Sequence, residues 1–241
     1  MLTKYVLPGE KVELQTIEQS ILGAASNKKA YTSKIFDILD EEQFEILMPM
    51  EQMKMILLPV DGIYDMCFYT KNGLYQSNVR IVDRYKSNNI FILLCELTTP
   101  LRKYQRREYY RFSCILNMEA RLLDEEELAA ADKNQIYYKD GLQTQKGTIV
   151  DISGGGVRFV TKEYHYEVGD TIYLTYQLPL KNRMKTYEIA GKVLAMRKIP
   201  EKQGEYEHRL QYINIEKTDR EEIIRYIFEE ERRNRQRRNG S

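Results

Sequence analysis

The sequence contains no tryptophan, only three cysteines and only two histidines among its 241 residues. Cys67, Cys95 and Cys114 lie far apart without any C-x-x-C pair, and His165 and His208 stand alone. Zinc sites and catalytic cysteine sites need clusters of such residues, so neither class has a basis here. We expect reduced cysteines on strands and histidines that are solvated in strands or loops.

Long apolar runs are also missing. The longest, Ile90–Cys95, is far too short to span a bilayer. The N-terminus carries charge and proline within its first eleven residues and lacks the apolar segment of a signal peptide. We therefore expect a soluble, cytoplasmic protein without membrane insertion.

The sequence also lacks a large excess of positive or negative charge. The formal net charge is +1, although 30 % of the residues are charged and 42 % are hydrophobic. The hydrophobic fraction is ordinary for a globular protein, and the near-neutral charge excludes a polycation that coats nucleic acid or membrane. Any anion site must come from local clustering of basic residues.

What is present is alternation of apolar and polar residues with period two, which predicts strands in both halves of the chain. Asn72-Gly73 between two such runs predicts a hairpin. A short helical segment is predicted near Glu51–Met55, and Leu123–Lys146 is expected to be a long loop with one helical turn that projects from the barrel. The predicted strands are Lys11–Leu14, Lys34–Leu39, Phe44–Met48, Gly62–Thr70, Leu74–Arg84, Ile90–Leu97, Phe112–Leu122, Gly147–Ile152, Gly156–Thr161, Thr171–Leu178, Tyr187–Arg197 and Glu205–Ile213.

One helix is predicted near the C-terminus. Thr218-Asp219-Arg220-Glu221 fits a capping box, and an apolar stripe follows at Ile223, Ile224, Ile227 and Phe228. Antiparallel strands without intervening helices favour closed barrels. The predicted fold is mainly β, with two β-barrel domains and a C-terminal α-helix. We expect the first domain over residues 1–98, a basic interdomain linker over 99–111 and the second domain over 112–241.

Two short motifs carry candidate chemistry. Arg107 and Arg111 form R-x-x-x-R, and Asp151, Ser153 and Gly156 form D-x-S-x-x-G about forty residues later. Arginine presents a planar fork of donors that suits phosphate and the O6/N7 edge of guanine. A short carboxylate accepts hydrogen bonds from the N1–H and N2–H of guanine, and glycines allow close backbone approach. Together the motifs predict a guanine-nucleotide site.

Each motif alone has a simpler interpretation. R-x-x-x-R is often a solvated charged stretch, and D-x-S-x-x-G fits a tight hairpin whose glycines adopt positive φ. Their order, their spacing and the position of the first motif on a linker favour a shared binding site.

The two motifs in this order resemble the PilZ domain, a bacterial receptor for cyclic di-GMP. The resemblance covers about residues 104–232, and residues 8–98 are similar to the N-terminal domain of flagellar-brake (YcgR-like) proteins. Both motifs are complete. The resemblance implies the YcgR-like split barrel followed by a PilZ barrel.

The resemblance also implies roles for particular residues. Arg107 and Arg111 would contact phosphates and guanine, Asp151 and Ser153 would bind a guanine edge, and Gly156 would keep the floor of the pocket open. Arg106, just before the first motif, implies two intercalated ligands per protomer.

As a mechanism, the resemblance implies a receptor rather than an enzyme. The ligand would fix the orientation of the two domains, and a flagellar stator or rotor-switch protein at the basal body would read that change, with motility as the output. The main alternative is a single-stranded RNA-binding barrel in which Tyr104, Tyr109 and Tyr110 stack on bases. A third interpretation is a structural adaptor whose PilZ motif no longer binds ligand.

Overall fold

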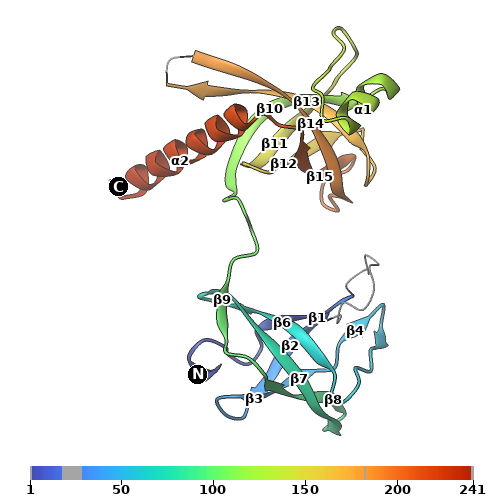
Figure 1. The fold of residues 1–241 in the computed structure, drawn as a ribbon, viewed down its shortest axis with the longest axis vertical. Coiled ribbons are helices and arrows are strands. Elements are labelled where there is room, and N and C mark those ends of the chain that lie inside the picture. Colours follow the sequence, from blue (N-terminus) through green and yellow to red (C-terminus); the bar gives the residue numbers. More distant parts are fainter. Residues whose placement is uncertain (1, 18–28, 182, 240–241) are drawn as a thin grey trace. The chain divides into compact units, whose positions relative to one another are not determined.

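The chain folds into two compact units, Met1–Arg106 and Arg107–Ser241, each with its own apolar core (Figure 1). The computed structural model describes residues 2–17, 29–181 and 183–239. The division between the units falls inside the basic segment 99–111 that the sequence suggests as a linker.

The first unit is a closed six-stranded barrel. Its strands follow the order β6-β1-β2-β3-β8-β7, and pairing of β6 with β7 closes the ring. The additional strand β9 pairs with β7, so three residues expected in the linker belong to this sheet. The bounds are β1 (Lys11–Thr16), β2 (Ala30–Ile38), β3 (Gln43–Leu47), β6 (Ile63–Thr70), β7 (Gly73–Ser87), β8 (Ile90–Leu97) and β9 (Arg102–Tyr104), after a short 3-10 helix at Leu2–Lys4.

Tight turns join β6 to β7 and β7 to β8, as their residue types predict. The β6–β7 hairpin closes at the pair Thr70 and Gly73, and Gly73 has φ of 116°. Asn88 and Asn89 join β7 to β8 with φ of 46° and 65°, as a two-residue hairpin turn requires.

The predicted helical segment near Glu51–Met55 is wrong. The structure has a small hairpin there, with β4 (Met50–Glu51) paired to β5 (Lys54–Met55). All four strand residues are exposed, so no buried apolar stripe stabilises a helix.

The second unit is also a closed six-stranded barrel, in the order β10-β11-β12-β15-β14-β13. The prediction of two barrels and a C-terminal helix is therefore confirmed. The bounds are β10 (Phe112–Leu122), α1 (Glu125–Asp132), β11 (Gln145–Ser153), β12 (Gly156–Lys162), β13 (Thr171–Leu180), β14 (Arg183–Lys198), β15 (Glu205–Ile213) and α2 (Lys217–Asn239).

Helix α2 packs on this barrel through Ile223 and Ile227, which are fully or almost fully buried. Two details differ from the sequence prediction. The helix begins before Thr218, whose hydroxyl donates to the Glu216 carboxylate, so Thr218 is not the N-cap. Phe228 is 63 % exposed, and Tyr226 takes its expected place in the core, because the buried side of the helix is centred on Ile223 and Ile227.

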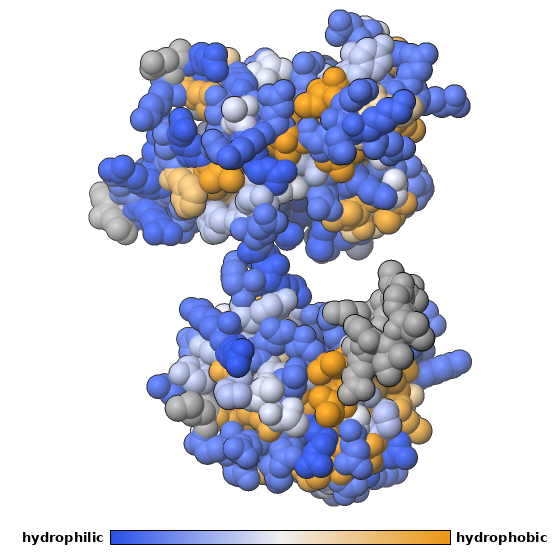
Figure 2. All heavy atoms as spheres, viewed as in Figure 1, coloured by the Kyte–Doolittle hydropathy of each residue, from blue (hydrophilic) through white to orange (hydrophobic). Residues whose placement is uncertain are grey.

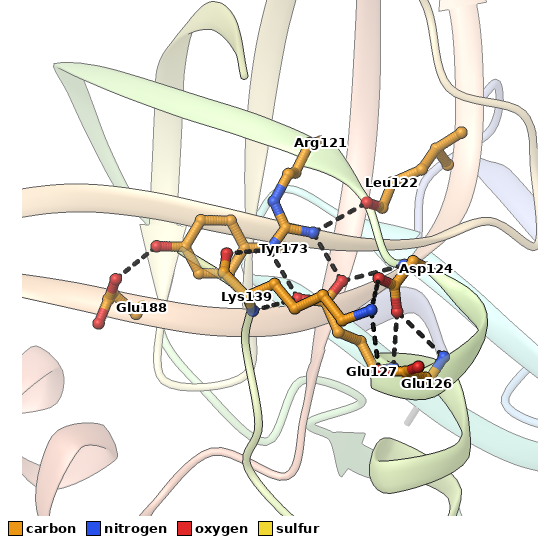
Figure 3. Close-up of polar contacts among 8 residues, drawn as sticks. All are labelled: Arg121, Leu122, Asp124, Glu126, Glu127, Lys139, Tyr173 and Glu188. Carbon is orange, nitrogen blue, oxygen red and sulfur yellow. Dashed lines mark hydrogen bonds and ion pairs between the residues drawn. The ribbon is translucent and has the colours of Figure 1, made fainter. Parts of the chain in front are cut away.

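The stretch expected as a long loop contains α1 and is tied to the barrel by a buried ion pair (Figure 3). Asp124 and Glu127 form the capping box that begins α1. Arg121 donates to both carboxylate oxygens of Glu127, at 2.7 and 2.6 Å, and to the Lys139 carbonyl at 3.1 Å. Its guanidinium also lies over the Tyr173 ring. This network fixes the loop on the barrel wall.

Hydrophilic side chains dominate the face of each unit that Figure 2 shows, and apolar side chains reach the surface in small groups. Among residues 2–17, 29–181 and 183–239, no helix has the length and apolar character that crossing a membrane needs.

His208 is a correction to the sequence analysis. The expectation of a solvated histidine holds for His165, but His208 is fully buried. Its ring stacks on Phe159 at 4.8 Å, and its Nε2 accepts from the Tyr166 backbone at 3.0 Å. The register of β12 with β15 turns this side chain toward the core. Burial lowers the pKa of His208 to about 4.

This burial predicts a pH-dependent stability. The folded pKa lies below the ordinary value of 6.5, so the unfolded state binds the proton more readily. The contribution is complete above pH 6.5 and is lost as the pH falls toward 4. We expect the free energy of unfolding to fall by about 2 kcal/mol between pH 7 and 5 from this group. Urea denaturation at several pH values measures it.

A matched pair of variants isolates the effect. His208→Gln keeps a side-chain acceptor for Tyr166 but cannot titrate, so its stability is expected to change less over this pH range. His165→Gln, at the exposed histidine, is expected to keep the full dependence. Equal pH dependence in all three proteins would contradict the assignment.

Candidate functional site

The D-x-S-x-x-G motif forms the turn between β11 and β12. Ser153 pairs with Gly156, its hydroxyl donates to the Gly156 carbonyl at 3.0 Å, and it accepts from the Gly155 backbone at 3.3 Å. The serine is 8 % exposed. In this structure the hydroxyl holds the turn closed.

Two glycines of the turn are required by close packing. A Cβ at Gly156 would lie 2.0 Å from the Leu210 carbonyl oxygen, because β12 and β15 approach closely there. A Cβ at Gly154 would lie 2.6 Å from the Tyr109 ring and 2.8 Å from Ile224 of α2. Glycine is therefore needed at both positions: Gly156 lies against the backbone of the neighbouring strand, and Gly154 lies against the Tyr109 ring.

Tyr109 brings the first motif to this turn. It lies between Arg107 and Arg111 in sequence, and its ring covers Gly154 and Gly155. Its hydroxyl accepts from Arg220 of α2 at 2.8 Å, and that guanidinium lies 5.5 Å from the ring centroid. The ring thus packs between the turn and the helix and holds the R-x-x-x-R segment beside D-x-S-x-x-G.

A row of charged residues crosses the outer face of the barrel next to the turn. Asp151 pairs in register with Arg158, and Arg158 pairs with Arg209. The residues that alternate with them point inward and are buried: Ile152, Val157 and Leu210. Period-two alternation therefore places one carboxylate and two guanidinium groups side by side on three strands.

Arg158 is held by two carboxylates. Its Nε lies 2.5 Å from Asp151, and its terminal nitrogen lies 2.8 Å from Glu207. Burial would raise the pKa of Glu207, but hydrogen bonds and charge from Arg197 and Arg158 keep it below its ordinary value. Arg158 is thereby fixed against the barrel wall.

Arg111 lies in a field of positive charge. Burial, and then the charges of Arg107, Arg209 and Arg158, lower the pKa of its guanidinium, and the charge of Asp151 acts against them. The positive charges of Arg107, Arg158 and Arg209 thus act on Arg111 beside a carboxylate, Asp151, that already pairs with Arg158. Such an arrangement attracts an anion, which would relieve the repulsion.

Arg106 has a different environment. Its guanidinium contacts Glu13 at 3.2 Å and the Tyr69 hydroxyl at 2.5 Å, and both residues belong to the first unit. The second unit therefore contains five of the six predicted residues, and Arg106 contacts the first barrel.

Sequence reasoning missed Arg158 and Arg209. Arg158 lies two residues after Gly156 on an alternating strand, and that spacing from Asp151 across a tight hairpin was a usable signal. Arg209 is about fifty residues further on, and only the β12–β15 register reveals it. Tyr109 was considered only as a base-stacking residue for RNA, whereas its ring is packed against the turn.

Comparison with known proteins agrees with this architecture. The family model described as PilZ domain matches residues 105–229, and the model described as Flagellar protein YcgR matches residues 8–97. No curated protein matches the sequence.

Two solved structures illustrate the similarity. The inhibitor of motility (MotI/DgrA) of Bacillus subtilis has a TM-score of 0.72 at 20 % identity, over 94 % of this chain and 98 % of that one. YcgR from Escherichia coli in complex with c-di-GMP has a TM-score of 0.47 at 12 % identity, over 96 % and 88 %. Since the PilZ model alone matches more than half of the chain, the protein belongs to the PilZ domain family, with a YcgR-type domain preceding the PilZ domain.

Proposed function

We propose that this protein is a receptor for cyclic di-GMP. The observation that carries the proposal is the row of Asp151, Arg158 and Arg209 on three neighbouring strands of a PilZ domain, beside its glycine turn, with the charges of Arg158 and Arg209 acting on Arg111 of the first motif. A cyclic dinucleotide has two phosphates and two guanines, which match guanidinium forks and a carboxylate. The site would bind its ligand rather than transform it.

Within this proposal the motif residues have different roles. Arg107 and Arg111 contact phosphate and guanine, and Asp151 accepts from a guanine edge while it orients Arg158. Ser153, which we predicted to bind a guanine edge, and Gly156, which we predicted to keep the pocket floor open, support binding by shaping the turn, because the Ser153 hydroxyl donates to the Gly156 carbonyl and Gly156 lies against the neighbouring strand. A ligand contact for either residue stays a prediction.

Arg106 underlies the proposed stoichiometry of two ligands per protomer. Its present contacts are to Glu13 and Tyr69, so the proposal requires it to exchange those partners for ligand. We expect Arg106→Ala to lower the ligand number from two toward one. An unchanged ratio in a calorimetric titration would refute this role.

The proposed output is a change of orientation between the two units that a flagellar stator or rotor-switch protein recognises in the cytoplasm, at the basal body. Support comes from the YcgR-type match and from a relative whose name is inhibitor of motility. A ligand can shift such an equilibrium only by its differential affinity, and a hundredfold preference is about 2.7 kcal/mol.

Calorimetric titration with a panel of ligands tests the receptor proposal. We expect selective binding of cyclic di-GMP over GMP and cyclic AMP. Generic single-stranded RNA would be the ligand if the protein were an RNA-binding barrel. We expect it to bind weakly, because Tyr109 is packed against the turn. Absence of heat with cyclic di-GMP, or tighter and strongly salt-dependent RNA binding, would overturn the proposal.

A further inference from the structure

Arg106 is held by two residues of the first barrel, Glu13 and Tyr69. One terminal nitrogen, Nη1, donates both to Glu13 at 3.2 Å and to the Tyr69 hydroxyl at 2.5 Å. The guanidinium carbon lies 5.3 Å from the centroid of the Tyr69 ring. Lys11 completes the group, with its ammonium 3.2 Å from Glu13 and 4.7 Å from the same ring centroid.

The donors and acceptors of this group are consistent with one another. Tyr69 donates its hydroxyl proton to Glu13 and accepts from Arg106, so the three polar groups form a closed triangle. Burial would raise the pKa of Glu13, but hydrogen bonds from Tyr69 and Lys11 and the charges of Lys11 and Arg106 lower it. Burial and the bond to Glu13 raise the pKa of Tyr69 to about 12. At neutral pH the carboxylate is charged and the phenol is protonated, as the triangle requires.

The contacts with Glu13 and Tyr69 occupy groups of Arg106 that would also bind a nucleotide. Nη1 has two hydrogens, and Glu13 and Tyr69 take both, so the end-on pair of nitrogens cannot grip a phosphate. The Tyr69 ring covers one face of the guanidinium, so a guanine can stack only on the opposite face. An end-on grip of phosphate by Arg106 therefore requires release of Nη1 from Glu13 and Tyr69.

We propose that Glu13 and Tyr69 form a latch that competes with the dinucleotide for Arg106 and sets the affinity of the second ligand. This inference rests on the proposed function, and it adds residues outside both binding motifs as determinants of affinity and stoichiometry. When only a fraction of the protein has Arg106 released, the apparent dissociation constant of the second ligand rises by the inverse of that fraction. The latch therefore makes the receptor respond to higher concentrations of its ligand.

Glu13→Gln tests the latch, because it removes the charge but keeps the shape of the side chain. In calorimetric titrations of the full chain with cyclic di-GMP, we expect the second binding event to become three- to tenfold tighter, about 0.6 to 1.4 kcal/mol. The first event is expected to stay unchanged. Tyr69→Phe keeps the ring and removes the hydroxyl, so it should shift the second event in the same direction.

The barrel offers a matched control. Glu96 is 27 % exposed, as Glu13 is 24 % exposed, and it lies 2.6 Å from Arg80 in an ion pair of the same barrel. Glu96→Gln is expected to leave both binding events as in the wild type. Glu13→Gln combined with Arg106→Ala should bind like Arg106→Ala alone, because the latch acts only through that arginine.

The outcomes separate the latch from the receptor proposal. A folded Glu13→Gln or Tyr69→Phe protein whose second event is unchanged or weaker overturns the latch while the receptor stands. A single binding event in wild type and in both latch variants overturns the latch too, because Arg106 then contacts no second ligand. The absence of heat in wild type overturns both proposals. Thermal unfolding of each variant verifies that the barrel is intact.

Discussion

Arg111→Ala is expected to weaken cyclic di-GMP binding by about 100-fold, about 2.7 kcal/mol, without destabilising the ligand-free protein. Charge-assisted hydrogen bonds contribute about 1.5 to 3 kcal/mol each, so the loss of one or two such bonds gives this range. The effect on stability follows from the lowered pKa of Arg111. Burial and the charges of Arg107, Arg209 and Arg158 disfavour its positive charge in the folded protein.

Removing Arg111 therefore relieves repulsion while it removes a ligand contact. We expect the melting temperature of the ligand-free variant to equal or exceed that of the wild type, and the increase on adding cyclic di-GMP to be lost. Arg102→Ala is the control, because Arg102 is exposed on β9 of the first barrel. Undiminished binding by Arg111→Ala would contradict the site, and a large fall in stability would show a structural role instead.

Arg121→Met is expected to lower the free energy of unfolding by about 3 to 5 kcal/mol. Arg121 and Glu127 side chains are 7 % and 0 % exposed, and the variant leaves the carboxylate buried without its cation. Hydrogen bonding from Arg121 is the main cause of the lowered pKa of Glu127. In the variant that pKa is expected to rise, so the lost stability should be partly regained at low pH. Urea denaturation measures both effects.

The double variant Arg121→Met with Glu127→Gln tests the origin of this loss. Glutamine carries no charge, and its side-chain oxygen can still accept from the backbone of Asp124 or Lys139, as the carboxylate does. We expect it to recover about half of the lost stability or more, since an unpaired buried charge is the main penalty. If the free energy of unfolding of Arg121→Met alone lay within about 1 kcal/mol of the wild-type value, water would have to reach Glu127.

Much of the fold could be predicted because its signals are local. Period-two alternation defines the strands of both barrels, and residue pairs such as Asn88-Asn89 specify two-residue turns. The errors came where burial decides the conformation. Met50–Met55 forms a hairpin because no core faces it, and Phe228 is exposed because α2 turns another side toward the barrel.

The candidate site was predictable in part for the same reason. Both motifs are short, and the tight β11–β12 hairpin makes Asp151 and Arg158 neighbours within one sequence segment. Arg209 and the packing of Tyr109 against Gly154 depend on contacts between distant segments. Glu13, the partner of Arg106, is separated from it by 93 positions. No periodicity or motif encodes such a pairing.

The sequence by itself determined two barrels, a C-terminal helix and the two candidate motifs, because alternation, turn chemistry and motif spacing act over a few residues. Only the tertiary structure decided which charged residues come into contact. Strand register places Arg158 and Arg209 beside Asp151 and buries His208, the docking of α1 pairs Arg121 with Glu127, and barrel closure supplies Glu13 and Tyr69 to Arg106. The physical reason is that a shift of one residue turns a side chain to the other face of a sheet, and register is fixed by the whole barrel.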